Sequence, residues 1–569
     1  MPNIRFTLWI ALGAVLYYNY LAWQQDYRPS PQLTSATAGA AAGTHGSLFN
    51  SVPTPDGAAA SAVPAQSAAA TPAATPAAPP GALGTAADSS AAKVHVITDV
   101  LDLDISLRGG QIDRADLPEY PLHKDTPNVP VRLENDDPAS LYVVQTGLTG
   151  ASGEAAPSHL ATFTAAQTSY TLPDGATELR VPLTWTDDSG LTVTKTFVFK
   201  RGLYQIELLY DAHNDSTAPR SLASYAQILR HWEHASRSYF DVETYSFKGP
   251  EVFDGTKSHH LNVESDTESK FSETITDGWL AALQHHFVSA IVPPQNQPYR
   301  YQLQVEDHQY LLSATGPFKQ IAAGASAQFS EKLFIGPKLQ SQLAATGPRL
   351  DLAADYGPLL TVISHPLFVA LNWVHGVTGN WGWAIILVTV LIKLIFYPLS
   401  QASGRSMAKM RAVAPRMKQI QDTFKDDREK LGRAMMDLYK REKINPLAGC
   451  LPMVVQIPVF ISFYWVLVES VEMRQAPFMM WINDLSAHDR FFVLPLLMGI
   501  AMFAQFKLNP PPPDPTQAKI MQFMPLVMTG MMAWFPSGLV LYWLTNTVLS
   551  ILQQWRINQV IQATVKPGS

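Results

Sequence analysis

Residues 381–399 read WGWAIILVTVLIKLIFYPL, and this stretch decides the class of protein. A bilayer core needs about 20 consecutive apolar helical residues, so the run predicts a transmembrane helix. Lys393 is its one charged residue. A charge at this depth costs about 2.5–3.5 kcal/mol on insertion scales, which makes it a functional hypothesis by default. The alternative is a lysine whose stem reaches the membrane interface near Ser400.

Four more apolar runs follow, at residues 447–468, 491–506, 518–535 and 536–555. With 381–399 they predict a core of five membrane-spanning helices within residues 380–556.

Another apolar run, Phe6 to Trp23, stands at the N-terminus and follows Arg5. It ends in bulky aromatic residues and lacks the small residues of a signal-peptidase site, so we predict an uncleaved signal anchor over residues 1–23. The alternative is a cleaved signal peptide with an unusual site.

The segment 400–445 carries twelve Lys and Arg residues against six Asp and Glu, which predicts that it is cytoplasmic. Parity then places the C-terminus inside and residues 93–340 outside, in agreement with an N-terminus inside. Apolar residues in the segment recur at helical spacing on both sides of a turn at FKDD, which predicts a helical hairpin with a basic outer face. The apolar residues are Met407, Met410, Ala414, Met417, Leu431, Met435 and Leu438.

The basic face of this hairpin is a candidate cytoplasmic docking surface, with Arg411, Arg416 and Lys418 as its test residues. The alternative is that these charges only fix the orientation of the spans.

Residues 93–340 have a different pattern, with alternating apolar residues and many β-branched and aromatic ones. LTWTDDSGLTVTKTFVF, residues 183–199, predicts two strands joined by a turn at Asp-Asp-Ser-Gly. We predict a large antiparallel β-sandwich here. The flanking segments are predicted as an Ala/Pro-rich disordered linker (24–92), an amphipathic helix in the membrane interface (341–379) and a short cytoplasmic tail (557–569).

The composition agrees with an α+β membrane protein that has a water-soluble part. Charged residues are only 15% of the chain, yet the mean hydropathy is +0.01. Residues 1–380 hold 22 basic and 36 acidic residues, and residues 381–569 hold 19 and 11, so the net charges are −14 and +8. One cysteine excludes a disulfide framework and a zinc ribbon. We find no catalytic or metal-ligand pattern and no signature of DNA binding, and expect no cofactor.

Polar residues in the other spans can line a water-filled cavity around Lys393. Thr389 lies one turn before it, and Gln456 lies inside the second core span. In the last span Asn546, Ser550 and Gln553 form one polar stripe, for which helix-to-helix hydrogen bonding is the alternative reading.

Four segments carry a resemblance to a known family. GNWGWAIILVTVLIKLIFYPLSQASGRSMAKMRAVAPRMKQIQ, LYKREKINPLAGCLPMVVQIPVF, VEMRQAPFMMWINDLSAHD and FPSGLVLYWLTNTVLSILQQW together resemble the YidC membrane protein insertases, from about Leu352 to Trp555. The order of anchor, β domain, interfacial helix and five-span core looks like the long Gram-negative form.

The resemblance implies a bacterial inner-membrane protein whose β domain is periplasmic. Its hydrophilic, lipid-open groove inserts and helps to fold nascent membrane proteins, alone or with the Sec translocon. The family's groove charge is commonly Arg, and Lys393 stands there, which keeps the charge but loses the bidentate fork. The resemblance also maps Thr389 and Trp543 to client contacts. The C-terminal tail holds one Lys, so ribosome docking is expected at the hairpin.

Two other functions stay open at this point. A transporter or channel would use Lys393 as an anion site in the membrane, although the five spans show no internal repeat. A glycan-binding protein would use the β domain, provided that acids and aromatic residues converge in a cleft.

Overall fold

The computed structural model describes residues 47–53, 55, 92–151, 154–232, 246–354, 361–424, 427–442, 451–508 and 515–565. The predicted anchor and most of the predicted linker lie outside these residues.

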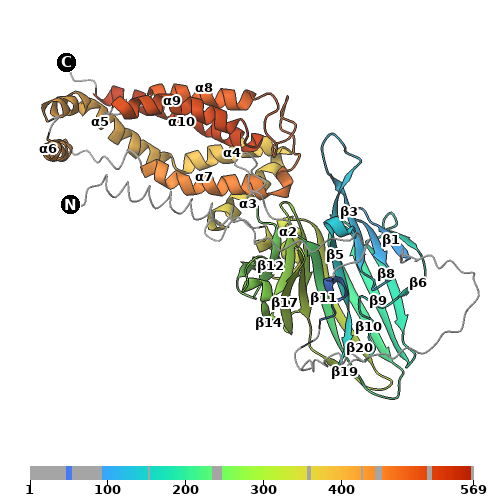
Figure 1. Cartoon of the computed structure of the whole chain (residues 1–569). Helices are drawn as coiled ribbons and strands as arrows, with labels where there is room; N and C mark the ends of the chain where they lie inside the picture. The colour runs from blue at the N-terminus through green and yellow to red at the C-terminus, as the bar shows by residue number, and fades with distance from the viewer. Residues whose placement is uncertain are drawn as a thin grey trace, which may run out of the picture. The chain divides into compact units, whose positions relative to one another are not determined.

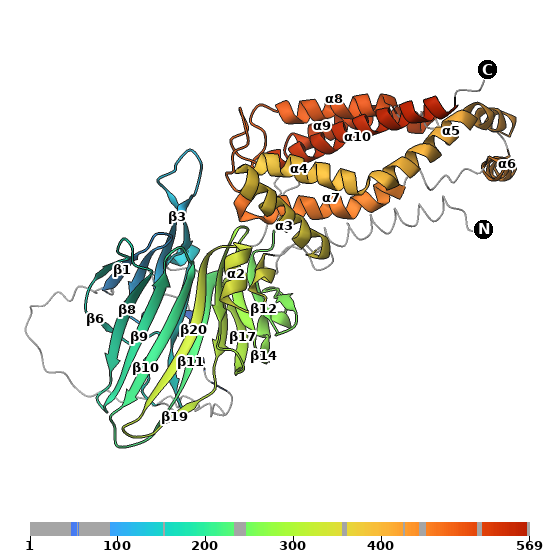
Figure 2. The ribbon, with the colours of Figure 1, turned by 180° about the vertical axis from the view of Figure 1, so that it is seen from behind.

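Two large sheets form the β-rich domain and pack face to face around one apolar core (Figures 1 and 2). The first sheet runs in the order β14 (Ser272–Thr276), β17 (Pro298–Glu306), β18 (Gln309–Thr315), β11 (Arg220–His231), β5 (Tyr142–Gly150), β3 (Ile112–Pro121), β2 (Asp102–Ser106), β1 (Lys93–Ile97) and β7 (Ser169–Thr171), with β19 (Lys319–Ile321) beside β11 and β4 (Pro130–Glu134) beside β3. The second runs β13 (Ser258–His260), β12 (Gly249–Phe253), β15 (Trp279–Leu283), β16 (Phe287–Val292), β20 (Ser326–Pro337), β10 (Gln205–Asn214), β9 (Leu191–Lys200), β8 (Glu178–Thr186) and β6 (Thr164–Ala165).

The predicted hairpin of residues 183–199 is confirmed as β8 and β9, paired antiparallel. Asp187 accepts hydrogen bonds from the backbone of Ser189 and Leu191, and Gly190 adopts a φ of 98°, which a residue with a side chain rarely takes. Among the described strands the pairing is antiparallel except between β1 and β7, so the antiparallel sandwich is also confirmed.

The predicted linker is wrong at one place, because residues 47–53 pack against the first sheet. Ser47–Asn50 form the 3-10 helix η1, visible as the short dark-blue segment beside β11 in Figure 1. Leu48 and Phe49 are each 6% exposed and contact residues of β5, β11 and β18. We call residues 47–53 the strap. Further 3-10 helices within the described residues are η2 (Pro138–Ser140), η5 (Glu268–Lys270), η6 (Leu350–Ala353) and η8 (Val471–Met473).

The predicted interfacial segment 341–379 divides into two parts. Its first part, α2 (Gln340–Thr346) and η6, belongs to the β-rich domain, because Leu343 and Leu350 are fully buried in the sandwich core. The second part contains α3 (Thr361–Thr378), which has Phe368 and Leu371 on one buried face and Trp373 72% exposed on the other.

The C-terminal part is helical, as predicted. Its elements are α4 (Trp381–Ile395), α5 (Tyr397–Thr423), α6 (Arg428–Arg441), α7 (Leu451–Glu469), α8 (Val493–Leu508), α9 (Pro515–Met532) and α10 (Ser537–Val565). In the described residues no helix by itself has the length and apolar content for a membrane span, whereas the pair α4 and α5, bent by 59°, reaches them jointly. The first part of the predicted tail, residues 557–565, continues α10 as a helix, since no helix-breaking residue precedes Pro567.

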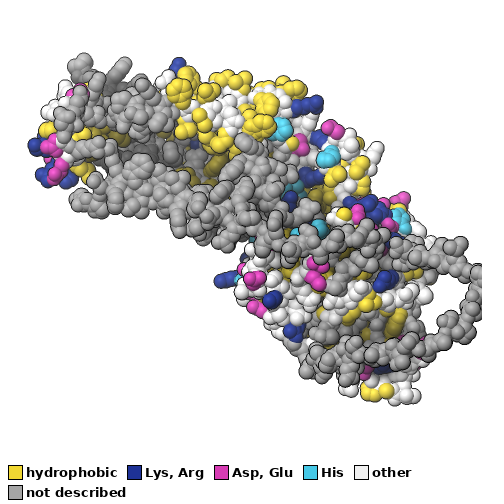
Figure 3. All heavy atoms as spheres, viewed as in Figure 1, with side chains coloured by type: hydrophobic (Ala, Val, Ile, Leu, Met, Phe, Trp, Pro, Cys, Tyr) yellow, Lys and Arg dark blue, Asp and Glu magenta, His cyan; other side chains and the backbone are white. Residues whose placement is uncertain are grey.

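One apolar cluster joins α3, α4, α7, α8, α9 and α10. Phe463, Met498 and Leu539 are fully buried in it. The outer side of α8 is also apolar, with Leu496 and Ile500 each 59% exposed, and Figure 3 shows this surface in yellow. A helix that is apolar on its buried and exposed sides suits a lipid environment.

Candidate functional site

Lys393 lies on α4 and reaches across to α10. Its Nζ donates a hydrogen bond to Oγ of Ser550 at 2.8 Å, and the lysine is only partly exposed. In the described part of the chain this ammonium forms no ion pair with a carboxylate. The charged ammonium of Lys393 therefore has a neutral hydroxyl as its acceptor, and two of its three N–H groups remain available for other acceptors.

Ser550 connects Lys393 to further polar groups on α10 and α7. The Ser550 hydroxyl donates to the backbone oxygen of Asn546 at 2.7 Å. Nε2 of Gln456 donates to Oδ1 of Asn546, also at 2.7 Å. Lys393, Ser550, Asn546 and Gln456 thus form a polar track across three helices of a mainly apolar bundle. Two of its members, Lys393 and Ser550, are 157 residues apart in the chain.

Other predicted groove residues do not join this track. Thr389 is 1% exposed, and its hydroxyl donates to the backbone oxygen of Ile385 in its own helix. Trp543 packs edge-on against Phe460, with ring centroids 4.8 Å apart. Gln553, one turn after Ser550, has a buried Nε2 without a hydrogen-bond partner. It is the one predicted groove residue that carries an unused buried donor.

Sequence reasoning missed Tyr542, which is 2% exposed and bonds to the side chain of Gln456. Its ring stacks on Phe463 with centroids 4.3 Å apart. Tyr542 directly precedes the predicted residue Trp543 on α10, and its side chain faces α7. The signal available in the sequence was an aromatic residue with a polar tip inside an apolar run.

The predicted hairpin is present as α5 and α6, whose contact is an apolar cluster that includes Met417 and Leu438, together with Val413, which the spacing argument had not included. The side chain of Arg416 is exposed and pairs with Glu442 of the same hairpin at 2.6 Å. The side chains of Arg411 and Lys418 lie outside the described residues.

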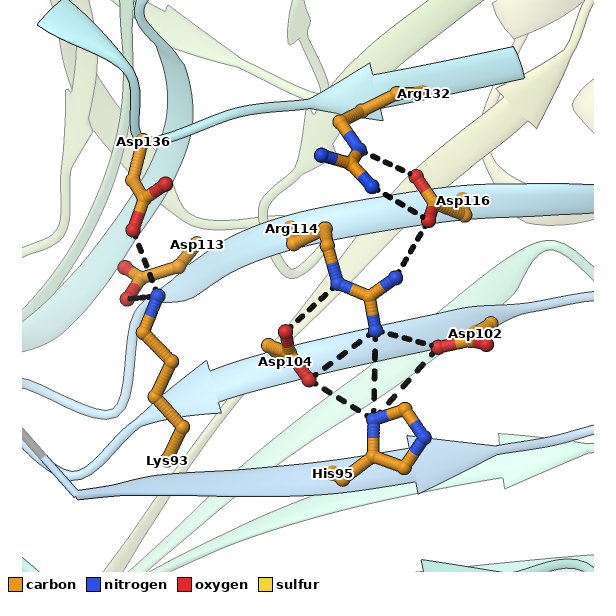
Figure 4. A network of polar contacts seen from close by, with 9 residues as sticks. All are labelled: Lys93, His95, Asp102, Asp104, Asp113, Arg114, Asp116, Arg132 and Asp136. Atoms are coloured by element: carbon orange, nitrogen blue, oxygen red, sulfur yellow. Dashed lines mark hydrogen bonds and ion pairs between the residues drawn. The ribbon is translucent and has the colours of Figure 1, made fainter. Parts of the chain in front are cut away.

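Two charged clusters of the described β-rich domain, one around Arg114 and one around Lys195, are satisfied by their own neighbours. On the outer face of the first sheet, Arg114 pairs with Asp102, Asp104 and Asp116 at 2.8, 2.7 and 2.5 Å (Figure 4). Arg132 also pairs with Asp116, and the ring of His95 lies 2.9 Å from Asp104, whereas Lys93 beside them forms its own pairs with Asp113 and Asp136 (Figure 4). This network joins β1 to β4 and leaves no group of acids and histidines, within the described chain, that could hold a metal ion.

Lys195 forms the second cluster inside the sandwich, where it is fully buried. Its ammonium donates to the backbone oxygens of Gly109, Gly110 and Thr146 at 2.8, 2.7 and 3.0 Å. Burial holds the pKa of Lys195 well below its usual range. Because three carbonyls use all three donors, this lysine has no capacity left for a ligand.

Comparison with known proteins agrees with this division of the chain. Residues 93–370 match the family model described as the YidC periplasmic domain, and residues 373–564 match the model described as 60Kd inner membrane protein. The chain is 43% identical to the membrane protein insertase YidC of Thioalkalivibrio sulfidiphilus over 100% of both chains. It is 42% identical to that of Nitrosococcus oceani over 99% of both.

A solved structure described as an active YidC insertase crystal structure with the first transmembrane domain resolved is 17% identical, with a TM-score of 0.36, over 82% of this chain and 92% of that chain. The family assignment rests on the sequence matches.

The matched models define a protein of the bacterial inner membrane that carries a large periplasmic β domain. More narrowly, the chain belongs to the YidC family of membrane protein insertases. Its substrates are nascent membrane proteins, and its β-rich domain is the periplasmic one.

Proposed function

We propose that the polar track of α4, α7 and α10 is the place where a client segment crosses the insertase core. Lys393 attracts an acidic residue of the client, and the Ser550 hydroxyl, a neutral partner, is exchanged for the stronger carboxylate. Asn546 and Gln456 supply further hydrogen bonds to the client backbone. The observation that carries the proposal is the Lys393–Ser550 contact, in which an ammonium inside an apolar bundle has no counter-ion among the described residues.

Three more residues complete the proposed client-binding set. Gln553 adds an unused buried donor one turn beyond Ser550 on α10. Trp543 and Thr389 lie on the same two helices as Ser550 and Lys393, where the family resemblance expects client contacts. No covalent bond is made or broken in this scheme, so the protein acts as an insertase and chaperone without enzymatic turnover.

The proposed topology has an N-terminal anchor, five core spans and both termini in the cytoplasm. The support is the bias of basic residues, twelve of which lie in residues 400–445. In this arrangement the α5–α6 hairpin faces the cytoplasm and receives the ribosome through Arg411, Arg416 and Lys418. The Sec translocon is a proposed lateral partner. Single cysteines on either side of the membrane, tested with an impermeant maleimide, check each loop.

The charge of Lys393 is tested by substitution. Lys393→Arg should retain insertion of a client with an acidic leading segment, Lys393→Ala should lose part of it, and Lys393→Glu should lose it, because the last change repels the client carboxylate. Protease protection of the client's translocated end measures insertion. Lys507→Glu on α8 is the matched control, since Lys507 contacts the ring of Phe503 and lies outside the track. Full protection in Lys393→Glu would reject the charge model.

A further inference from the structure

The strap covers polar side chains that would otherwise face water. Gln145 of β5 and Gln227 of β11 point away from the sandwich core, yet both are 0% exposed. Nε2 of Gln145 donates to the backbone oxygen of Phe49 at 3.3 Å, and Nε2 of Gln227 donates to that of Ser51 at 3.1 Å. His159 Nε2 also donates to the Phe49 oxygen, at 3.0 Å. The amides thus hold the strap by its backbone.

An apolar surface beside these amides holds the two large side chains of the strap. It consists of Leu141, Val143, Leu229 and Leu311, which form with Leu48 and Phe49 a buried cluster separate from the sandwich core. With Gln145 and Gln227 we call these residues the strap face. Recognition by backbone carbonyls plus two adjacent apolar side chains is a pattern that many peptide sequences can satisfy.

The strap is an incomplete partner for this surface. Oε1 of Gln227 is buried and accepts no hydrogen bond from any residue that the structure describes. A buried acceptor left without a donor is unfavourable, so a peptide that places a backbone N–H there would bind better than the strap does.

We propose that the strap face is a binding site for an extended peptide with two adjacent large apolar side chains, which competes with residues 47–53. The protein that supplies such a peptide is the translocated part of a client, so this inference rests on the proposed function. Until a client arrives, the strap keeps the apolar surface covered, which prevents association between copies.

A labelled peptide of sequence SLFNSVP, that of residues 47–53, tests the site on the purified full-length chain in detergent. The double variant Leu48→Ser, Phe49→Ser vacates the face and should bind the peptide at least tenfold more tightly than the wild type, by fluorescence anisotropy. A peptide with Ala in place of its Phe should bind the variant at least tenfold more weakly. Absent binding to the folded variant, or equal binding of both peptides, would overturn the proposal.

A second variant covers the case in which the double variant does not fold. Leu48→Cys in a Cys450→Ser background places a thiol under the strap. An excess of unlabelled peptide should raise its maleimide labelling rate at least fivefold, and an unchanged rate would equally overturn the proposal. Neither measurement requires insertion, so the two tests are independent. A negative result here does not affect the Lys393 test, and normal insertion by Lys393→Glu does not affect the test of peptide binding.

Discussion

The side-chain amide of Gln456 on α7 donates to the side-chain oxygen of Asn546 on α10 at 2.7 Å, and so joins two helices inside an apolar bundle. Asn546 also offers its backbone oxygen to Ser550, which holds Lys393. The position of the charge is therefore tied to an amide pair that does not touch it.

Removing one amide of this pair should cost more than removing both. Asn546→Leu leaves the Gln456 amide short of a partner, at about 1–3 kcal/mol, whereas Gln456→Leu with Asn546→Leu removes both polar groups. Thermal unfolding of the purified chain measures the stability of each variant in a double-mutant cycle. Thr545→Val is the control, because the Thr545 hydroxyl donates to the backbone oxygen of Leu541 in its own helix and joins no second helix among the described residues. Additive losses would show that the two amides act independently.

A carboxylate placed at Ser550 should block clients that carry acidic residues. The Ser550 hydroxyl now accepts a hydrogen bond from Lys393 at 2.8 Å, so Ser550→Asp places a permanent counter-ion beside the ammonium. Because this carboxylate competes with that of the client, insertion of an acidic client should fall by about tenfold. Ser550→Ala leaves the ammonium free for the client and should insert it normally. The two variants are compared by protease protection, with a client lacking acidic residues alongside. An acidic client that inserts normally with Ser550→Asp contradicts the exchange step.

Neutralising the hairpin should separate docking from topology. Arg411→Gln, Arg416→Gln and Lys418→Gln together leave nine of the twelve basic residues of 400–445, enough to keep the orientation. Ribosome co-sedimentation should fall by about an order of magnitude at physiological salt and depend less steeply on salt than in the wild type. Unchanged co-sedimentation, with unchanged topology, would leave only the topological role for these charges.

His159 should make the β-rich domain less stable in mild acid. Burial lowers its pKa to about 4, so the folded state keeps the ring neutral while the unfolded state takes up a proton below about 6.5. Its contribution to stability is therefore complete above pH 6.5 and is lost as the pH falls from 6.5 to 4, by about 3 kcal/mol in total.

His159→Gln removes that titration while keeping a side-chain donor. Chemical unfolding of the wild type and of the variant between pH 7 and 4 measures the difference. The free energy of unfolding of the wild type should decline relative to the variant across this window. Parallel pH profiles would mean that His159 titrates normally in the folded chain.

Local sequence chemistry predicted those elements whose signals are local. The Asp187 to Gly190 turn carries its own hydrogen-bonding residues, and the flanking strands alternate, so the hairpin follows from seventeen consecutive residues. The α5–α6 hairpin likewise follows from the apolar spacing and the turn at FKDD, whose last residue, Asp427, caps α6 in the structure. Lys393 was evident because a charge in an apolar run needs no structure to be recognised.

Features that depend on distant partners could not be predicted. The strap lies in low-complexity sequence, which gives no sign of its partners. One residue of the cluster that buries Phe49 is Leu311, which lies more than 250 positions later in the chain. Thr389 was expected to face the groove, but a threonine hydroxyl can satisfy itself on the preceding turn, and it does so on Ile385. The pairing of Gln456 with Asn546 depends on how α7 and α10 pack together, and the local sequence of neither helix specifies that packing.

The break between α4 and α5 falls at Phe396, three residues after Lys393, and the two helices meet at 59°. Less than one helical turn therefore separates Lys393 from the start of α5, the 27-residue first helix of the basic hairpin. A rotation of α5 about Phe396 would turn the last carbonyls of α4 and the stem of Lys393 with them. A load on the far end of the hairpin would then change the distance between the ammonium and Ser550, as far as the contacts of α5 with α7 and α10 let the helix move.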